Sequence, residues 1–333
     1  MRRQDAIISG NKITTQIWNY GSISEPGNRV TDIIWEGLGY GYEFGPFISA
    51  EVPLVSNKHP DAYPKVIDGD TTWYARVISD GLVTDPERSP DGSEYWTWEP
   101  LAYSDEGLFF ADPDYDKIPT ASDIDRDFDG KPDSWASDWY NPNLKEYVWP
   151  GDLRQGASNA DEEAFFVCDD RNNKEFEYYP FPDDSSRKGL GIQIEYRYYQ
   201  WANPLAEDII FLIYKITNKS PKDLENVIFG MWGDPHIGGP SDWSDDLSYF
   251  DQEINMVYCW DEDGSASGSA NRPGYFGYKF LESPGNPYDQ LDNDSDGMID
   301  ESRSNGIDDD GDWDPEKDDV GVDGVPNLSL IHI

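Results

Sequence analysis

Residues 192–198, IQIEYRY, alternate apolar and polar side chains with a period of two. This period places successive side chains on opposite faces of an extended chain, which indicates a β-strand. Residues 209–217 form a largely apolar run with β-branched side chains, which predicts a buried strand of a β-sandwich. A polar turn at 218–223 separates this run from predicted strands at 227–232 and 255–260. Since helix signals are sparse, the sequence predicts a mainly β protein, an antiparallel β-sandwich with long acidic loops.

The N-terminal part of the chain extends the β pattern. Residues 14–20, 40–48 and 71–78 are rich in aromatic and β-branched side chains and are predicted strands. Residues 37–42, GLGYGY, lack the third glycine of a G-x-G-x-x-G dinucleotide-binding loop, which excludes that kind of site. Residues 80–160 are rich in Pro, Asp, Gly, Ser and Trp and predict a long loop region. Because unstructured loops of that length are rare in compact domains, we expect bound metal to keep this one ordered.

The charge of the chain restricts its partners. Its 333 residues contain 67 acidic and 25 basic side chains, a formal net charge of −42. Such a charge repels phosphate, which excludes nucleic acid and anionic membrane surfaces as partners, and it favours bound cations. The acidic surface of a halophile's protein would account for the same composition. With 13 Trp and 21 Tyr, the chain nevertheless has enough bulk for a packed core.

Two features bear on the compartment. The two cysteines, Cys168 and Cys259, are compatible with one disulfide in an exported chain or with two buried thiols. No run of about 18 apolar residues occurs, so no transmembrane segment is expected.

Residues 125–133 read D-x-D-x-D-G-x-x-D, a spacing that lets carboxylates converge in a tight loop. Gly130 stands where such a loop turns sharply, and Ca²⁺ is the hard cation that accepts six to eight oxygen ligands of this kind. A solvated acidic turn is the alternative. Because Ala136 replaces the twelfth-position Glu of an EF-hand, the loop resembles thrombospondin type 3 or dockerin calcium loops. The expected ligands are the side chains of Asp125, Asp127, Asp129 and Asp133 and the backbone carbonyl of Lys131.

The same pattern recurs near the C-terminus. Residues 292–300 match it in full, again without the EF-hand Glu, since Arg303 occupies that position. A third stretch at 308–312 has Trp313 at the turn position, so it is expected either to bind metal, to share ligands with its neighbour, or to remain an acidic turn. The expected ligands are the side chains of Asp292, Asp294, Asp296 and Asp300 with the carbonyl of Met298, and then Asp308, Asp310 and Asp312.

A further acidic cluster follows the predicted strand at 227–232. Its members flank the turn at 238–240, and they form either another cation site or a polar loop at the end of a sandwich. These residues are Asp234, Asp245, Asp246 and Asp251.

Several motifs occur together in the second half of the chain. They are EAFFVCDD (163–170), QWANPL (200–205), ITN (216–218), GMWGDPHIG (230–238), DD (245–246) and DDVGVDG (318–324). With these motifs the chain resembles large exported surface proteins of the Bacteroidota and related phyla, some of which end in a type IX secretion sorting domain. The resemblance covers most of residues 10–327 and is architectural, not catalytic. It implies export to the cell surface or medium, calcium loops and β-sandwich modules.

Signatures of catalysis are few. The chain has no H-E-x-x-H motif and no P-loop, and residues 264–268 carry Ala where a nucleophile elbow needs Ser. Carboxylate pairs for glycoside hydrolysis stay open because their separation is not readable from sequence. The sequence therefore favours an exported, calcium-stabilised structural or adhesive protein whose partners are calcium, glycans or other cell-surface proteins. The alternatives are a carbohydrate-binding or carbohydrate-active module and an acidic protein of a halophile.

The two ends of the chain need separate interpretation. Residues 1–10 lack the apolar region of a signal peptide. Residues 328–333, LSLIHI, back-translate to CTG-TCT-CTT-ATA-CAC-ATC, which resembles the transposon end used in sequencing libraries. We therefore expect these six residues to be adapter-derived and the natural chain to continue past Asn327. The expected organisation is a β-sandwich region of one or two modules at 1–280, with an inserted calcium loop near 123–135, followed by an acidic calcium-binding repeat or linker at 281–327.

Overall fold

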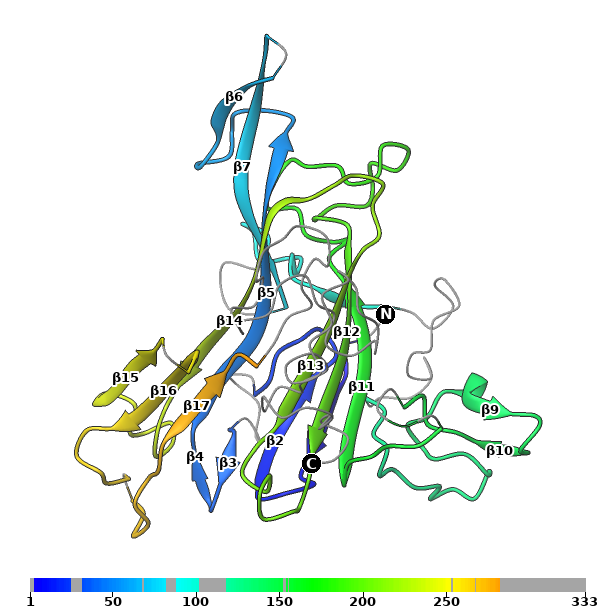
Figure 1. Ribbon diagram of the computed structural model, residues 1–333, viewed down its shortest axis with the longest axis vertical. Coiled ribbons are helices and arrows are strands. Elements are labelled where there is room, and N and C mark those ends of the chain that lie inside the picture. The colour runs from blue at the N-terminus through cyan, green and yellow to red at the C-terminus, as the bar shows by residue number, and fades with distance from the viewer. Residues whose placement is uncertain are drawn as a thin grey trace, which may run out of the picture. The chain divides into compact units, whose positions relative to one another are not determined.

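The protein is mainly β and is built from small antiparallel sheets (Figure 1). The structure, a computed structural model, describes residues 3–24, 32–67, 69–81, 88–101, 118–151, 154, 156–252, 254–266 and 268–281. Over these residues it contains no α-helix and one 3₁₀ turn, η1 (Ser137–Trp139). The predicted mainly β class and antiparallel pairing are thus confirmed. The described ranges include no helix long and apolar enough to cross a membrane.

The chain divides into two compact units. The first holds residues 1–246 and 260–274, and the second holds 247–259 and 275–333. The described part of the second unit centres on a three-stranded sheet in the order β15-β16-β17. Its strands are β15 (Asp246–Asp251), β16 (Met256–Asp261) and β17 (Phe276–Lys279), and β16 confirms the strand expected at 255–260.

One four-stranded sheet of the first unit has the order β13-β12-β11-β8. The strands are β8 (Glu99–Pro100), β11 (Glu162–Asp169), β12 (Ile192–Gln200) and β13 (Phe211–Asn218). The predicted strand at 192–198 is therefore β12, and it is buried on both faces instead of one. One of its polar side chains, Arg197, is buried in an ion pair with Glu163 of β11 at 2.7 Å. β11, whose residues are all buried, was not predicted as a strand.

A second four-stranded sheet has the order β14-β5-β7-β6. Here the strands expected at 40–48, 71–78 and 227–232 are found, each longer than predicted. Gly230 of β14 lies against the ring of Phe47, where an added Cβ would come within 2.2 Å of the ring. Only glycine therefore permits this close pairing. The strands are β5 (Gly41–Leu54), β6 (Tyr63–Ile67), β7 (Asp70–Asp80) and β14 (Glu225–Pro235).

A third four-stranded sheet and a two-stranded sheet complete the described strands. The order β1-β2-β3-β4 joins β1 (Asp5–Ile8), β2 (Ile13–Trp18), β3 (Ile34–Trp35) and β4 (Leu38–Gly39), and β2 confirms the strand expected at 14–20. Ile23 bridges to Ile17 of β2 and to Phe44 of β5, which links this sheet to the second four-stranded sheet. The remaining pair is β9 (Tyr140–Asn141) with β10 (Glu146–Tyr147).

The prediction of a buried strand at 209–217 is wrong in one respect. The strand exists as β13, but its last four residues are exposed, and Ile216 is 38% exposed. β13 is the end strand of its sheet, so it has a strand neighbour on one side only and its side chains are covered less. Apolar composition alone does not distinguish such a strand from a central one.

The long loop region has an apolar core of its own. Trp135, Trp139 and Trp149 pack on Phe165 of β11, and we call these four residues the tryptophan cluster. Ring centroids lie 5.4 Å apart for Trp135–Trp149 and for Trp139–Trp149. Burial of these large rings packs residues 135–149 against β11.

The two cysteines are buried and are not joined in a disulfide. Cys168 lies in β11 and Cys259 in β16, and burial raises the pKa of the Cys168 thiol. Of the two alternatives left by the sequence, the structure shows two buried thiols.

Candidate metal centre

Residues 125–133, which we call the first loop, are shaped by the carboxylate of Asp125. Its Oδ1 accepts hydrogen bonds from the backbone N–H groups of Phe128 at 2.6 Å and Asp129 at 3.2 Å. Its Oδ2 accepts one from Gly130 N–H at 2.9 Å. The chain curls tightly enough to need left-handed backbone at Phe128, with φ 65°, and at Gly130, with φ 94°. The D-x-D-x-D-G spacing therefore produces the tight turn expected at the glycine.

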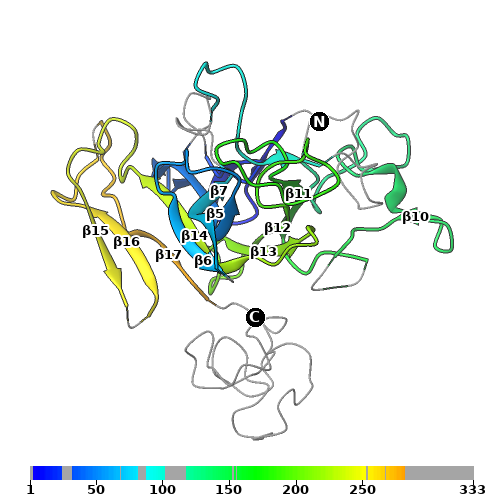
Figure 2. The same ribbon diagram turned by 90° about the horizontal axis from the view of Figure 1, so that it is seen from above.

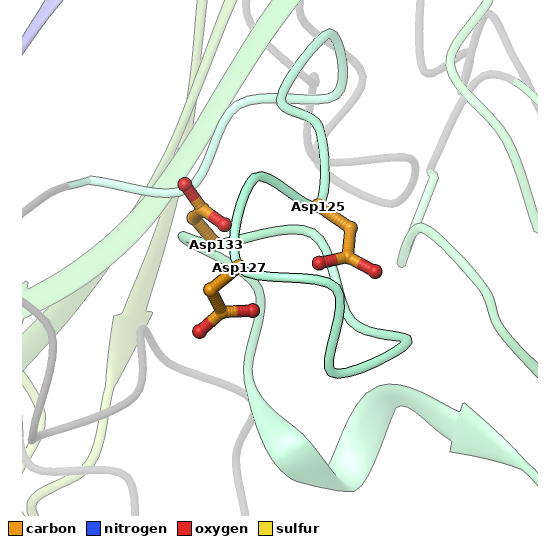
Figure 3. Close-up of side chains that lie close together, drawn as sticks. All are labelled: Asp125, Asp127 and Asp133. Carbon is orange, nitrogen blue, oxygen red and sulfur yellow. The ribbon is translucent and has the colours of Figure 1, made fainter.

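Three carboxylates of the first loop converge. One oxygen each of Asp125, Asp127 and Asp133 lies within 4.8 Å of the others, and Figure 3 shows the three side chains on the loop. Two ligands on opposite sides of a Ca²⁺ ion are about 4.6–5.2 Å apart, since each stands about 2.3–2.6 Å from the ion. The three oxygens therefore have a spacing that one Ca²⁺ can bridge.

The other two predicted ligands of the first loop have different contacts. Asp129 is not part of the converging set, and its Oδ1 accepts a hydrogen bond from Lys131 N–H at 2.8 Å. The Lys131 ammonium donates to the carbonyl of Trp135 at 2.7 Å. The structure thus brings together three of the four carboxylates that the spacing singled out.

An arginine within the first loop was not considered in the sequence prediction. Arg126 Nη1 forms ion pairs with Asp123 at 2.6 Å and with Asp133 at 2.9 Å. Burial opposes ionisation of Asp123, but hydrogen bonds from Ser134 and Arg126 outweigh it and hold the pKa of this carboxyl below its usual value. The Arg126 guanidinium offsets part of the negative charge of the first loop. A metal ion bound in the loop would therefore compete with Arg126 for the Asp133 carboxylate. The sequence signal for this ion pair was a basic residue at the second position of the D-x-D-x-D-G-x-x-D motif.

The first loop is attached to the protein through the residues that follow it. Ser134 N–H donates to Asp123 Oδ2 at 2.7 Å, and the indole of Trp135 donates to the carbonyl of Thr120 at 2.8 Å. Thr120 in turn bridges to Ala164 of β11. The tryptophan cluster and the sheet therefore determine where the carboxylates stand.

The acidic residues predicted after β14 do not form one group. Asp234 lies in β14 opposite Glu43 of β5, and Asp251 is the last residue of β15. Asp245 and Asp246 stand at the start of β15, where Asp245 converges with two other residues, Asp242 and Asp261. Sequence reasoning missed these two because nothing in the local spacing relates residue 261 to residue 245.

The two C-terminal candidate loops lie outside the described residues. They comprise the predicted ligands Asp292, Asp294, Asp296, Met298 and Asp300 and then Asp308, Asp310 and Asp312. The segment 281–327 lies there too, apart from Leu281, as do residues 328–333.

Comparison with known proteins adds no assignment. No protein-family model matches the chain, and no curated protein or solved structure is significantly similar to it.

Proposed function

We propose that the protein is an exported, calcium-stabilised structural or adhesive surface protein and that the first loop is one of its calcium sites. The observation that carries the proposal is the convergence of Asp125, Asp127 and Asp133 oxygens within 4.8 Å. The net charge of −42 supports it, because bound cations relieve repulsion within a compact acidic chain. Export rests on the resemblance of the motifs at 163–324 to those of exported surface proteins.

The proposed architecture is a β-sandwich of the β13-β12-β11-β8 sheet and the β14-β5-β7-β6 sheet, which lie side by side in both views (Figure 1, Figure 2). Side chains from the two sheets meet: the rings of Tyr214 on β13 and Phe229 on β14 are 5.4 Å apart. Trp98 packs on Tyr196 of β12 at 6.3 Å and donates its indole N–H to Ser79 of β7 at 2.9 Å. These contacts support a shared core between the sheets.

Calcium is expected to raise the melting temperature of the protein, and Asp127→Ala is expected to remove part of that increase. An ion that binds only the native state adds about 2.7 kcal/mol at a hundredfold excess over its dissociation constant. In chelator the variant should melt no lower than the wild type, because the substitution removes one of three like charges. Thermal denaturation of both proteins, with calcium and with chelator at low salt, measures this.

Asp138→Ala is the matched control, since Asp138 is an exposed carboxylate of the same region outside the converging set. It should respond to calcium like the wild type. Limited proteolysis in calcium gives a second readout: Asp127→Ala should be cut faster within residues 118–151, while β12 stays protected. Equal melting of the wild type in calcium and chelator would refute the proposal, and dependence on molar salt instead would favour a halophile's acidic protein.

A carbohydrate-binding module is the second candidate, and it is favoured by a row of tyrosines in the second unit. The rings of Tyr249, Tyr258 and Tyr275 form a row in space. The ring centroids of Tyr249 and Tyr258 are 5.7 Å apart, and those of Tyr258 and Tyr275 are 6.1 Å apart. Tyr249 is 55% exposed and Tyr275 is 72% exposed, so the row offers ring faces to a ligand.

If this row binds glycans, Tyr275→Ala and Tyr249→Ala should each weaken binding about tenfold, the loss expected for one aromatic contact of about 1.4 kcal/mol. Phe250 is also exposed, but it neighbours Tyr249 in β15 and therefore points to the opposite face. Phe250→Ala is the control and should leave binding unchanged. A glycan array with all three variants is the measurement, and absence of binding by the wild type removes this candidate.

A further inference from the structure

Three carboxylates from separate parts of the chain meet at the end of β16. Asp242 comes from the loop after β14, Asp245 immediately precedes β15, and Asp261 is the last residue of β16. One oxygen of each lies within 4.8 Å of the other two. The backbone reinforces the arrangement, since Glu262 N–H donates to the carbonyl of Asp245 at 3.2 Å.

The carboxylate of Asp261 has one oxygen without a hydrogen-bond donor. Its Oδ1 accepts hydrogen bonds from the backbone N–H groups of Gly264 and Ser265. Its Oδ2 is inaccessible to solvent and has no partner, and the whole residue is only 6% exposed. A buried anionic oxygen without a partner is costly, because it has lost its water and gained nothing in return. A cation at the meeting point of the three carboxylates supplies the missing partner.

Asp246 repeats this pattern beside the same group. Its Oδ2 accepts a hydrogen bond from Ile237 N–H at 2.8 Å, whereas its Oδ1 is buried and has no partner. A second buried carboxylate oxygen without a hydrogen-bond partner therefore lies next to Asp245.

The approach of Asp242 depends on a glycine. Gly238 has φ 96°, a backbone conformation that L-residues rarely adopt. A Cβ at this position would come within 2.8 Å of Asp242 Oδ2. The turn at 238–239 therefore places the Asp242 carboxylate close against Gly238.

We propose that Asp242, Asp245 and Asp261 bind a Ca²⁺ ion that ties the loop after β14 to the end of β16. All donors are carboxylate oxygens, the ligands of a hard cation, and their spacing fits the diameter of a calcium coordination shell. Ca²⁺ accepts irregular sets of ligands from separate segments, whereas Mg²⁺ requires a near-ideal octahedron and keeps most of its waters. The site is independent of the first loop, since the two groups share no residue.

Calcium stoichiometry of the full chain tests the proposal. Protein stripped with chelator is titrated with Ca²⁺ by calorimetry, as wild type, Asp242→Asn, Asp261→Asn and the double variant. We expect each single variant to bind one ion fewer than the wild type, and the double variant also to bind only one fewer, because both residues serve the same ion. Asp223→Asn is the matched control, because Asp223 is an exposed carboxylate outside the converging set.

Sensitised terbium luminescence reports the same site locally. Tb³⁺ is a luminescent substitute for Ca²⁺, and Trp243, next to Asp242 and 65% exposed, is the expected energy donor. Trp243→Phe should lower the emission without changing the stoichiometry. Asp242 is less buried than Asp261, so its variant keeps the test valid if Asp261→Asn fails to fold.

Unchanged stoichiometry in Asp242→Asn and in correctly folded Asp261→Asn would overturn the proposal, as would a double variant that loses two ions. Asp127→Ala combined with Asp242→Asn separates the two sites. If the combined variant binds two ions fewer than the wild type, both sites are supported. If it binds one ion fewer, the single variants show which site holds that ion, and the other site is ruled out.

Discussion

Replacing Asp170 with alanine is expected to lower the free energy of unfolding by about 4 kcal/mol or more, because each buried donor left without an acceptor costs about 1–3 kcal/mol. Asp170 is fully buried directly after β11. It accepts hydrogen bonds from the backbone N–H of Leu190 at 2.5 Å and from those of Gly191 and Ile192 at 3.1 Å, and from the Ser79 hydroxyl at 3.2 Å. The carboxylate thus joins the end of β11 to the start of β12 and to β7. Alanine removes the acceptor for all four donors at once.

Denaturant titration of the purified variant measures this effect. Asp184→Ala is the control, because Asp184 is an exposed carboxylate in the loop between the same strands and should change stability by only about 0.5–1 kcal/mol. If Asp170→Ala and Asp184→Ala lose the same small amount, the network around Asp170 does not hold β11 and β12 together.

Asp170 also predicts a pH dependence with a definite sign. Burial raises its pKa to about 7, against the hydrogen bond from Leu190 N–H that lowers it. Between about pH 4 and pH 7 the folded state therefore holds a proton that the unfolded chain has released, so its contribution to stability falls as pH rises, by at most about 1.4 kcal/mol per unit. Asp170→Asn cannot titrate, so the difference between wild type and variant should shrink as pH rises through this window. Denaturant titrations at several pH values measure it, and parallel curves would contradict the assignment.

Trp149→Ala is expected to lower the free energy of unfolding by about 3–5 kcal/mol, the usual range for removing a buried aromatic side chain. Trp149 is 2% exposed and its ring lies 5.4 Å from the rings of both Trp135 and Trp139, so the substitution leaves a void in the middle of the tryptophan cluster. The large effect follows because few other apolar side chains hold residues 118–151 in place. Calcium affinity of the first loop should fall as well, since Trp135 follows it directly.

Denaturant titration and limited proteolysis test this prediction together. Trp243→Ala is the control for loss of a tryptophan, because Trp243 is 65% exposed and its removal should cost about 0.5 kcal/mol or less. Faster cleavage within 118–151 should accompany the loss of stability in Trp149→Ala. A free energy of unfolding of Trp149→Ala within about 1 kcal/mol of the wild type would show that the tryptophan cluster is not a core. The expected loss of about 3–5 kcal/mol is large enough to distinguish from that result.

Several strands, β12 among them, and the first loop were predictable because their information is local. The period of two at 192–198 identified β12, since alternation is a property of neighbouring residues. The first loop was predictable for the same reason: Asp125 and Asp133 are close in sequence, and Gly130 between them provides the positive φ that the turn requires. Asp129, in contrast, does not join the converging oxygens, because its carboxylate accepts a backbone hydrogen bond that the sequence spacing does not specify.

Long-range features were decided only by the tertiary structure. Composition made residues 209–217 a candidate for burial, but the place of β13 at the end of its sheet leaves half of it exposed. Asp261 joins Asp242 only because β15 and β16 are neighbours in one sheet, and Asp170 lies against residues 190–192 only because the chain returns there after a loop. Spacing along a chain determines which groups can meet within one turn, whereas sheet pairing determines which distant groups share a low-dielectric interior. The sequence by itself therefore determined the β class and the first loop, and the tertiary structure determined which carboxylates are buried, partnered or without a partner.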